Sequence, residues 1–382
     1  MQIAAPWLGL PAVQQVCALL ENAGFQALFV GGCVRNTLLN HPVSDHDLST
    51  DARPDQVTCV MEEAGLRVVP TGIDHGTVTV VADGEPFEIT TFRRDIETDG
   101  RRAVVYFADD VVDDARRRDF TMNAIYCDCR GQIFDPLGGL PDLQARRLRF
   151  VGDAAERVLE DYLRILRFFR FSAWYADPDN GMDADALDAC ALHQDGLERI
   201  SAERIGGEMR KLLTAPDPGP SVAVMQTTGI LGTILPGSDV TALPVLIHLE
   251  RQNGQRADPM LRLASLGGEQ VSERLRLSRV EARRLATLGG SARSEQGAGE
   301  LGFRLGAADG LAVLTLRCAL MGISVPRAAQ GQVDAGAAAV FPISARDLMA
   351  ETSGPALGKR MKALERRWID SGFRLTQAEL LA

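Results

Sequence analysis

Two aspartates separated by one residue have the clearest potential for chemistry in this sequence. Asp45 and Asp47 open a short apolar strand within the stretch SDHDLST. Side chains alternate between the two faces of a strand, so we expect both carboxylates on one face and His46 on the other. Neighbouring carboxylates repel each other, and a divalent cation removes that repulsion. The pair is therefore a candidate metal site, although Asp-x-Asp is also typical of a solvated strand edge.

A glycine pair that precedes the aspartates could approach a phosphate group. Gly31 and Gly32 end an apolar run at residues 27–30, and a short helical segment follows through Leu38. Glycine lets the backbone come close to a ligand, and the free amides at a helix start favour anions. Arg35 adds a permanent cation. A Gly-Gly pair alone is usually only a turn, but beside the two aspartates it indicates a phosphate and metal cradle.

A third carboxylate, Glu88, lies on a later predicted strand. Residues 77–81 and 86–92 have strand patterns, and residues 82–85 (ADGE) between them are typical of a hairpin turn. An adjacent strand could bring Glu88 opposite Asp45 and Asp47. The alternative is an exposed strand glutamate without a function.

Two arginine-rich stretches follow these strands. Residues 93–102 (RRDIETDGRR) are too hydrophilic for a core and predict a mobile loop. Residues 116–124 (RRRDFTMNA) are predicted to open a helix. Three consecutive arginines most often form a solvated face, but next to Asp119 they could also contact a phosphate or a ribose.

A helix predicted over residues 154–175 carries a pair with recognition chemistry. Asp161 and Arg164 are three residues apart and therefore share a face, separate from the apolar stripe. The stripe consists of Leu159, Leu163, Leu166 and Phe169. An Asp offers only acceptors and an Arg only donors, so together they could read the amine and ring nitrogen of cytosine or adenine. The alternative is a surface ion pair, possibly extended to Arg157.

Composition limits the class of protein. The chain has 382 residues, long enough for two or three domains, and neither a membrane-spanning apolar run nor a signal peptide is expected. Its seven cysteines show no paired framework, which predicts a reduced, cytoplasmic location. The net charge of −10 argues against indiscriminate coating of nucleic acid. One basic C-terminal helix is a candidate site for binding the RNA backbone, and the alternative is a solvated face. Its basic residues are Lys359, Arg360, Lys362, Arg366 and Arg367.

Several motifs occur together in the order found in one family. They are GGCVRN with SDHD, FEITTFRRD, RRDFTMNAIY, LGGLPDL, VLEDYLRILRFFRF and ISAERIGGEMRKLL. Over residues 25–215 the chain resembles the class II tRNA nucleotidyltransferases and bacterial poly(A) polymerases. The resemblance implies an α+β fold with a mixed-sheet, polymerase-β-like nucleotidyltransferase head at residues 1–136. The head would be followed by an all-helical neck at residues 137–215. A helical body and tail at residues 216–382 would bind tRNA.

The resemblance also implies roles for individual residues. Asp45 and Asp47 would hold Mg2+, with Glu88 as the third catalytic acid. The implied nucleotide-binding residues are Gly31, Gly32, Arg35, Arg118, Asp119, Asn123, Glu160, Asp161 and Arg164. Among them, Glu160, Asp161 and Arg164 would form the amino-acid template for CTP and ATP. One departure is Asn36, where the motif of this family usually has Asp, so a charge is lost beside Arg35.

The implied activity is addition of C, C and A to the 3′ end of tRNA from CTP and ATP, without a nucleic-acid template. The 3′-hydroxyl would attack the α-phosphorus and release pyrophosphate with the help of two metal ions. Residues 93–102 could couple the switch from C to A addition. Alternatives are a poly(A) polymerase, an enzyme adding only CC or only A, and an inactive RNA-binding relative.

Overall fold

The computed structural model describes residues 1–98, 103–349 and 354–382. The chain divides into two compact units. The first contains Met1–Leu212 and Val224–Ile234, and the second contains Leu213–Ala223 and Leu235–Ala382. Within the described residues, none of the helices combines the length and apolar character that a membrane crossing needs.

Seven strands of the first unit form one mixed sheet in the order β3-β4-β5-β2-β1-β8-β9. The strands are β1 (Leu28–Val30), β2 (Asp47–Thr50), β3 (Arg67–Gly72), β4 (Thr77–Ala82), β5 (Glu85–Thr91), β8 (Tyr126–Cys127) and β9 (Ile133–Phe134). β2 and β5 run parallel, and the other neighbouring pairs are antiparallel. The predicted α+β fold with an N-terminal mixed sheet is confirmed.

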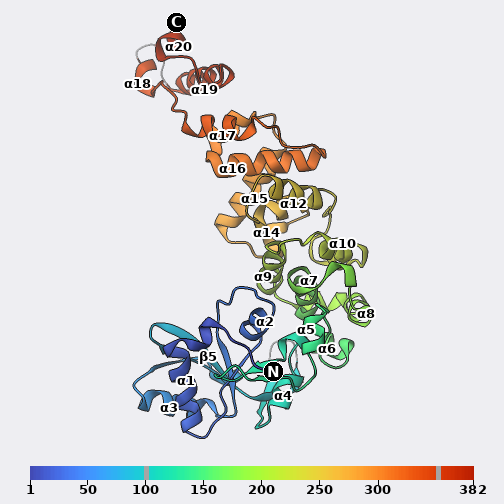
Figure 1. The fold of residues 1–382 in the computed structure, drawn as a ribbon. Helices are drawn as coiled ribbons and strands as arrows, with labels where there is room; N and C mark the ends of the chain where they lie inside the picture. The colour runs from blue at the N-terminus through green and yellow to red at the C-terminus, as the bar shows by residue number, and fades with distance from the viewer. Residues whose placement is uncertain (99–102, 350–353) are drawn as a thin grey trace. The chain divides into compact units, whose positions relative to one another are not determined.

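Helices pack on this sheet, and its strand β1 is apolar and buried on both faces. The helices are α1 (Pro11–Asn22), α2 (Gly32–Leu38), α3 (Pro54–Glu63) and α4 (Val111–Arg116). α1 and α3 pack on each other and on β4 (Figure 1). On β1, Phe29 contacts the Trp7 ring, whereas Leu28 and Val30 join a core cluster with Phe92. Burial on both faces fixes the register of the sheet.

Two predictions about the arginine-rich stretches are wrong. Residues 93–98 are a strand, β6 (Arg93–Thr98), which pairs with β7 (Ala103–Phe107) in a separate antiparallel hairpin rather than a loop. The rest of that predicted loop, residues 99–102, lies outside the described residues. The arginines at 116–118 end α4 instead of opening a helix, and only the short 3-10 turn η3 (Thr121–Asn123) follows.

The single helix predicted over residues 154–175 is two helices. The helices after the sheet are α5 (Leu140–Gln144), α6 (Ala154–Glu160), α7 (Leu163–Tyr175), α8 (Ala184–Leu192), α9 (Ala202–Leu213), α10 (Gly219–Thr227) and α11 (Ile230–Ile234). Asp161 is extended, with φ −151° and ψ 104°, and its carboxylate accepts the Leu163 amide (3.1 Å) at the start of α7. The break removes Leu159 from the predicted apolar stripe, and 49% of that residue is exposed.

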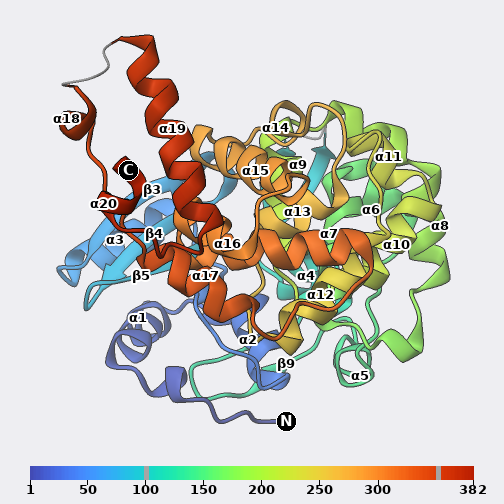
Figure 2. The ribbon, with the colours of Figure 1, turned by 90° about the horizontal axis from the view of Figure 1, so that it is seen from above.

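The second unit is helical. Its helices are α12 (Ala242–Gln252), α13 (Pro259–Leu266), α14 (Val271–Arg274), α15 (Arg279–Ala292), α16 (Ala298–Met321), α17 (Ala329–Ala338), α18 (Ala345–Leu348), α19 (Pro355–Asp370) and α20 (Gln377–Leu381). α16 and α17 run side by side (Figure 2). A Cβ at Gly302 would lie 2.0 Å from the Val333 carbonyl oxygen, so this close crossing requires glycine.

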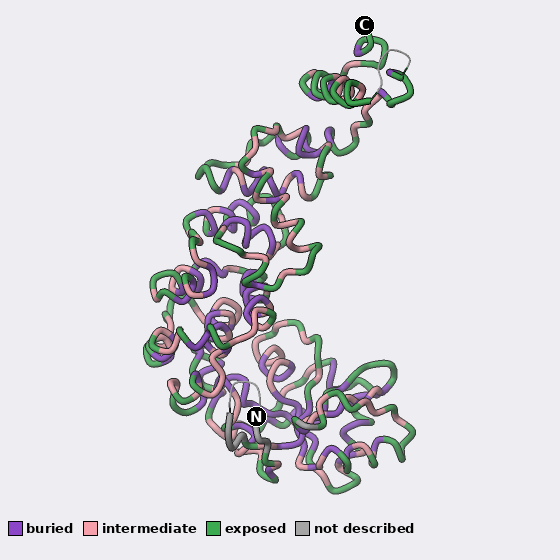
Figure 3. The backbone as a smooth tube through the Cα atoms, turned by 180° about the vertical axis from the view of Figure 1, so that it is seen from behind, coloured by how far each residue is buried: buried purple, intermediate pink, exposed green. Residues whose placement is uncertain are grey.

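Buried positions alternate with exposed ones along these helices (Figure 3). Near the C-terminus, Trp368 of α19 is the centre of a small apolar cluster. The buried members of the cluster are Ile343, Leu348, Trp368, Ile369 and Leu380.

Candidate functional site

The sheet brings the predicted carboxylates together. β2 and β5 pair in parallel, with Asp47 directly opposite Glu88. His46 lies on the other face, its ring centroid 5.2 Å from that of Trp7, as the predicted alternation requires. One detail differs, since β2 begins at Asp47 and Asp45 precedes it, accepting a hydrogen bond from Ser44 Oγ (2.9 Å).

The electrostatics of Asp47 suit a cation. The Asp47 side chain reaches the surface, yet the surrounding protein removes part of its water, and this raises its pKa. The Glu88 and Asp45 carboxylates raise the pKa further, while Arg118 opposes them. A bound cation would relieve this repulsion.

The donor set fits Mg2+ in particular. Across residues 1–98, 103–349 and 354–382, no three His, Cys, Asp or Glu side chains form a ready-made metal cluster. Mg2+ commonly binds through one or two carboxylates and takes its remaining oxygens from substrate phosphates and water. Asp45 and Asp47 can supply such carboxylates, with Glu88 beside them.

The Gly31–Gly32 turn lies between two guanidinium groups. Gly31 has φ 73°, a left-handed conformation that favours glycine. A Cβ on Gly31 would lie 3.7 Å from Arg118 Nη1, and one on Gly32 would lie 3.9 Å from Arg35 Nη2. Two guanidinium groups therefore lie beside the backbone of this turn, an arrangement that suits phosphate binding.

Arg35 is buried and held by neutral groups. It donates to Asn36 Oδ1 from Nε (3.2 Å) and Nη2 (2.9 Å), to Asn123 Oδ1 (2.6 Å) and to the Tyr175 hydroxyl (2.8 Å). Its guanidinium also stacks on the Tyr175 ring at 4.0 Å. Burial lowers the pKa of Arg35, although Tyr175 and Asp119 partly oppose this shift.

Arg118 is positioned by residues that the sequence analysis missed. Its Nη2 donates to Asp114 Oδ2 (3.0 Å) and Ser49 Oγ (3.2 Å), and its Nε donates to the Tyr126 hydroxyl (3.0 Å). Asp114 is fully buried and also pairs with Arg117. Burial would raise the pKa of Asp114, but Arg118 and Arg117 outweigh it and hold the pKa well below its usual range. The spacing of Asp114, three and four residues before these arginines, was the available signal.

Asp119 and Asn123 belong to a second buried network. Asp119 accepts from Arg167 Nε (2.8 Å), Asn123 Nδ2 (2.9 Å) and the Phe120 amide (2.9 Å). Its pKa is lowered to about 2, because Arg167 and these hydrogen bonds outweigh the effect of burial. Both oxygens of Asp119 thus have protein partners. Through Asn123 the network reaches Arg35.

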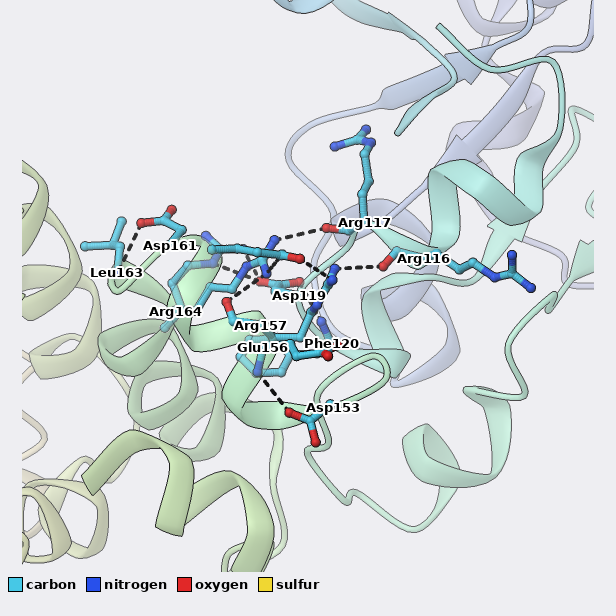
Figure 4. Close-up of polar contacts among 12 residues, drawn as sticks. Arg116, Arg117, Asp119, Phe120, Asp153, Glu156, Arg157, Asp161, Leu163 and Arg164 are labelled. Atoms are coloured by element: carbon cyan, nitrogen blue, oxygen red, sulfur yellow. Dashed lines mark hydrogen bonds and ion pairs between the residues drawn. The ribbon is translucent and has the colours of Figure 1, made fainter. Parts of the chain in front are cut away.

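Asp161 and Arg164 do not bond each other through their side chains, because each has another ion-pair partner. Arg164 donates to Glu160 Oε2 (2.6 Å), to the Arg157 carbonyl (2.9 Å) and to the Arg117 carbonyl (3.1 Å). Figure 4 shows Arg157 and Arg164 directed toward the backbone at residues 116–117. The two residues stay linked through the backbone, where the Arg164 amide donates to the Asp161 carbonyl (2.9 Å).

Asp161 has an ion-pair partner that sequence reasoning missed. Its Oδ2 accepts from Arg204 Nη2 of α9 (2.6 Å). Arg204 is 43 residues away in the sequence, and no local pattern indicated the contact.

The basic residues predicted to bind RNA lie on α19. Lys359, Lys362 and Arg367 are exposed, and Arg360 is half-buried. Arg366 pairs with Glu300 (3.1 Å) and Asp370 (3.0 Å), which neutralises part of the charge predicted for this helix.

Comparisons with known proteins place the chain in a family. Residues 27–149 match the family described as Poly A polymerase head domain, and residues 182–240 match the probable RNA and SrmB-binding site of polymerase A. The chain is 31% identical to CCA tRNA nucleotidyltransferase 1, mitochondrial, of Mus musculus, covering 97% of this chain and 89% of that protein. The chain belongs to the CCA tRNA nucleotidyltransferase family. It is therefore an enzyme, a nucleotidyltransferase.

Other members of the CCA tRNA nucleotidyltransferase family are also similar to this chain. A CCA-adding enzyme of Streptococcus pyogenes is 43% identical over 208 residues, which span 54% of this chain and 50% of that protein. The structure of the Bacillus stearothermophilus CCA-adding enzyme in complex with CTP matches with a TM-score of 0.73 and 26% identity, covering 96% of this chain and 94% of that one. The Thermotoga maritima CCA-adding enzyme complexed with tRNA, at 17% identity, covers 96% and 92% with a TM-score of 0.69 and shares the fold.

Proposed function

We propose that this enzyme adds C, C and A to the 3′ end of tRNA, using CTP and ATP and no nucleic-acid template. One arrangement carries the proposal. Asp47 stands opposite Glu88 on parallel strands, and the nearby Arg118 borders the Gly31 turn. Carboxylates for a cation and a cationic turn for a triphosphate are thus combined, as nucleotidyl transfer requires. The relatives named for CCA addition support the choice of substrate.

In this proposal the protein mainly positions the reacting groups and screens their charge. Mg2+ bound by Asp45 and Asp47 would lower the pKa of the attacking 3′-hydroxyl and neutralise charge on the departing pyrophosphate. Arg118 and Arg35 face the phosphates from the two sides of the glycine turn. Asp114 and the Tyr126 hydroxyl keep Arg118 in place, so little reorganisation accompanies transfer.

The base is selected by Asp161 and Arg164, with Glu160. An Asp accepts from the exocyclic amine and an Arg donates to the ring nitrogen, a pattern shared by cytosine and adenine but not by uracil or guanine. Arg204 and Glu160 hold the two groups before the base arrives. A wrong base would leave these groups unpaired, which explains discrimination without a template strand.

The remaining assignments follow from the same proposal. Residues 1–136 form the catalytic head, residues 137–215 the base-reading neck and residues 216–382 the tRNA-binding body and tail, with the basic face of α19 against the RNA backbone. A cytoplasmic location is supported by the seven free cysteines.

Extension of a tRNA transcript that lacks its CCA end tests the proposal. With Mg2+, CTP alone should add two residues, and CTP with ATP should add three and then stop. Long ladders with ATP alone would instead identify a poly(A) polymerase. Addition of only CC or only A would identify a partial enzyme, and no extension in any mixture would favour an inactive RNA-binding relative.

The β6–β7 hairpin is assigned to the switch from C to A addition. The Ala108 amide donates to the Phe92 carbonyl (2.7 Å), so the two ends of the hairpin lie together. Residues 93–107 can therefore be replaced by a Gly-Gly link without stretching the chain. The deletion should spare C addition and impair A addition, whereas equal loss of both would refute this role.

A further inference from the structure

The segment that delivers Asp45 is held by ring contacts of His41 with Tyr175 and of His46 with Trp7, and by hydrogen bonds at its start. It runs from the end of α2 to the start of β2 at Asp47. Within the part of the chain that the structure describes, the Asp45 carboxylate has one hydrogen bond, from the neighbouring Ser44 hydroxyl. The position of Asp45 therefore depends on how its segment is held.

Asn36 makes two hydrogen bonds to the start of this segment. Its carbonyl accepts from the His41 amide (2.7 Å), which closes the end of α2 around the left-handed residue Asn40 (φ 56°). Its side-chain Nδ2 then donates to the Pro42 carbonyl (2.7 Å), three residues before Asp45. Backbone and side chain of one residue thus fix the start of this segment.

The same amide also contacts the cation of the phosphate site. Asn36 Oδ1 accepts from Nε and Nη2 of Arg35. A guanidinium can only donate and a carbonyl can only accept, so the residue between Arg35 and Pro42 must do both. Asn satisfies this requirement. Asp, which the family motif leads one to expect here, could accept from Arg35 but would place an oxygen against the Pro42 carbonyl.

We propose that Asn36 is a positioning residue that ties the carboxylate segment to the Arg35 guanidinium. Arg35 in turn bonds the Tyr175 hydroxyl of α7 and Asn123. One chain of hydrogen bonds therefore runs from the segment of Asp45 to the helix that follows Asp161. This inference rests on the proposed function, because it assumes that Asp45 is a metal ligand.

The test compares the variants Asn36→Asp and Asn36→Ala with wild type. Asn36→Asp keeps the acceptor and removes the donor, and Asn36→Ala removes both without adding charge. Binding of Mn2+ alone, measured by electron paramagnetic resonance of the free ion, should weaken at least about threefold in both variants. The kcat for C addition should fall about tenfold, as expected for one lost hydrogen bond, while the KM for CTP changes less than about twofold.

Asn253→Asp is a matched control. Asn253 Nδ2 also donates to a backbone carbonyl, that of Leu249 (2.9 Å), in the second unit. This control should bind Mn2+ like wild type. Melting temperatures show whether each variant is folded, and Asn36→Ala decides the question should Asn36→Asp not fold.

Two results would overturn the inference. One is wild-type Mn2+ affinity and kcat in a folded Asn36 variant. The other is a rise in the KM for CTP with unchanged Mn2+ affinity, which would mean that Asn36 acts only through the charge of Arg35. Failure of the proposed function is distinguishable, because wild type itself would then not add CCA to tRNA.

Discussion

Replacing Asp47 with Asn is expected to abolish nucleotide transfer and, at the same time, to stabilise the metal-free protein. Asp47 stands opposite Glu88 in the sheet and near Asp45, and its pKa is raised by loss of water and by both carboxylates. Its negative charge is therefore unfavourable without a cation. Asn keeps the shape and removes the repulsion.

The size of the stabilisation follows from the geometry. Like charges facing each other on neighbouring strands cost about 0.2–1 kcal/mol. Because Asp47 is exposed, the repulsion at this position lies in the lower half of that range. For a unit of this size the melting temperature should rise by about 1–2 °C. Loss of several kcal/mol of charge stabilisation by the cation should lower the rate by about 10³-fold.

The stabilisation by Asp47→Asn should depend on pH with a definite sign. The pKa of Asp47 is raised in the folded state, so its charge destabilises the fold above that pKa. The advantage of Asp47→Asn should be complete at neutral pH. It should shrink as pH falls through the raised pKa and vanish below the ordinary aspartate pKa.

The assay is a thermal melt in a metal chelator, repeated with Mg2+, together with tRNA extension. Mg2+ should raise the melting temperature of wild type more than that of the variant. The control is Asp51→Asn, because Asp51 accepts from the Gln26 amide (2.7 Å) and stabilises the fold. That variant should melt lower and keep its activity. A lower melting temperature for Asp47→Asn in chelator would refute the reasoning.

Three further predictions concern other ion pairs. Asp114→Asn leaves Arg118 without its buried counter-charge and should lower the free energy of unfolding by about 3–5 kcal/mol; an unchanged urea midpoint would contradict this. Glu250→Gln breaks the buried pair with Arg262 (2.8 Å) and should lower the free energy of unfolding in urea by about 3 kcal/mol; a urea transition that coincides with wild type would contradict this. Arg164→Lys loses the planar donor fork and should reduce the preference for CTP over UTP at least about tenfold in primer extension; a preference unchanged from wild type would argue against a base-reading role.

Short apolar segments with turn signals were predictable because local chemistry alone forms them. The β4–β5 hairpin, the strand before Gly31 and the strand after Asp45 all follow from alternation and glycine. The carboxylates of Asp47 and Glu88 could be expected to meet, because a sheet offers few ways to place an adjacent strand.

Three local patterns were misleading because tertiary contacts outweighed them. The first part of a polar stretch became the strand β6, since backbone pairing with β7 needs no apolar side chains in β6. A continuous helical pattern broke at Asp161, whose carboxylate caps α7 and pairs with Arg204. The arginines before Asp119 ended a helix because Asp114 draws two of them back along α4.

The sequence by itself determined which side chains of this protein can bind a metal ion, a phosphate or a base. Residue types and the spacing of Asp45 and Asp47 indicated a metal and phosphate site, because side-chain chemistry and local periodicity depend on sequence alone. The order of motifs was sufficient for the resemblance to the family, and that resemblance implied the fold class. Only the tertiary structure decided which partner each charge takes. Long-range partners such as Arg204 for Asp161, or Asn36 between Arg35 and Pro42, depend on packing, and no spacing in the chain encodes them.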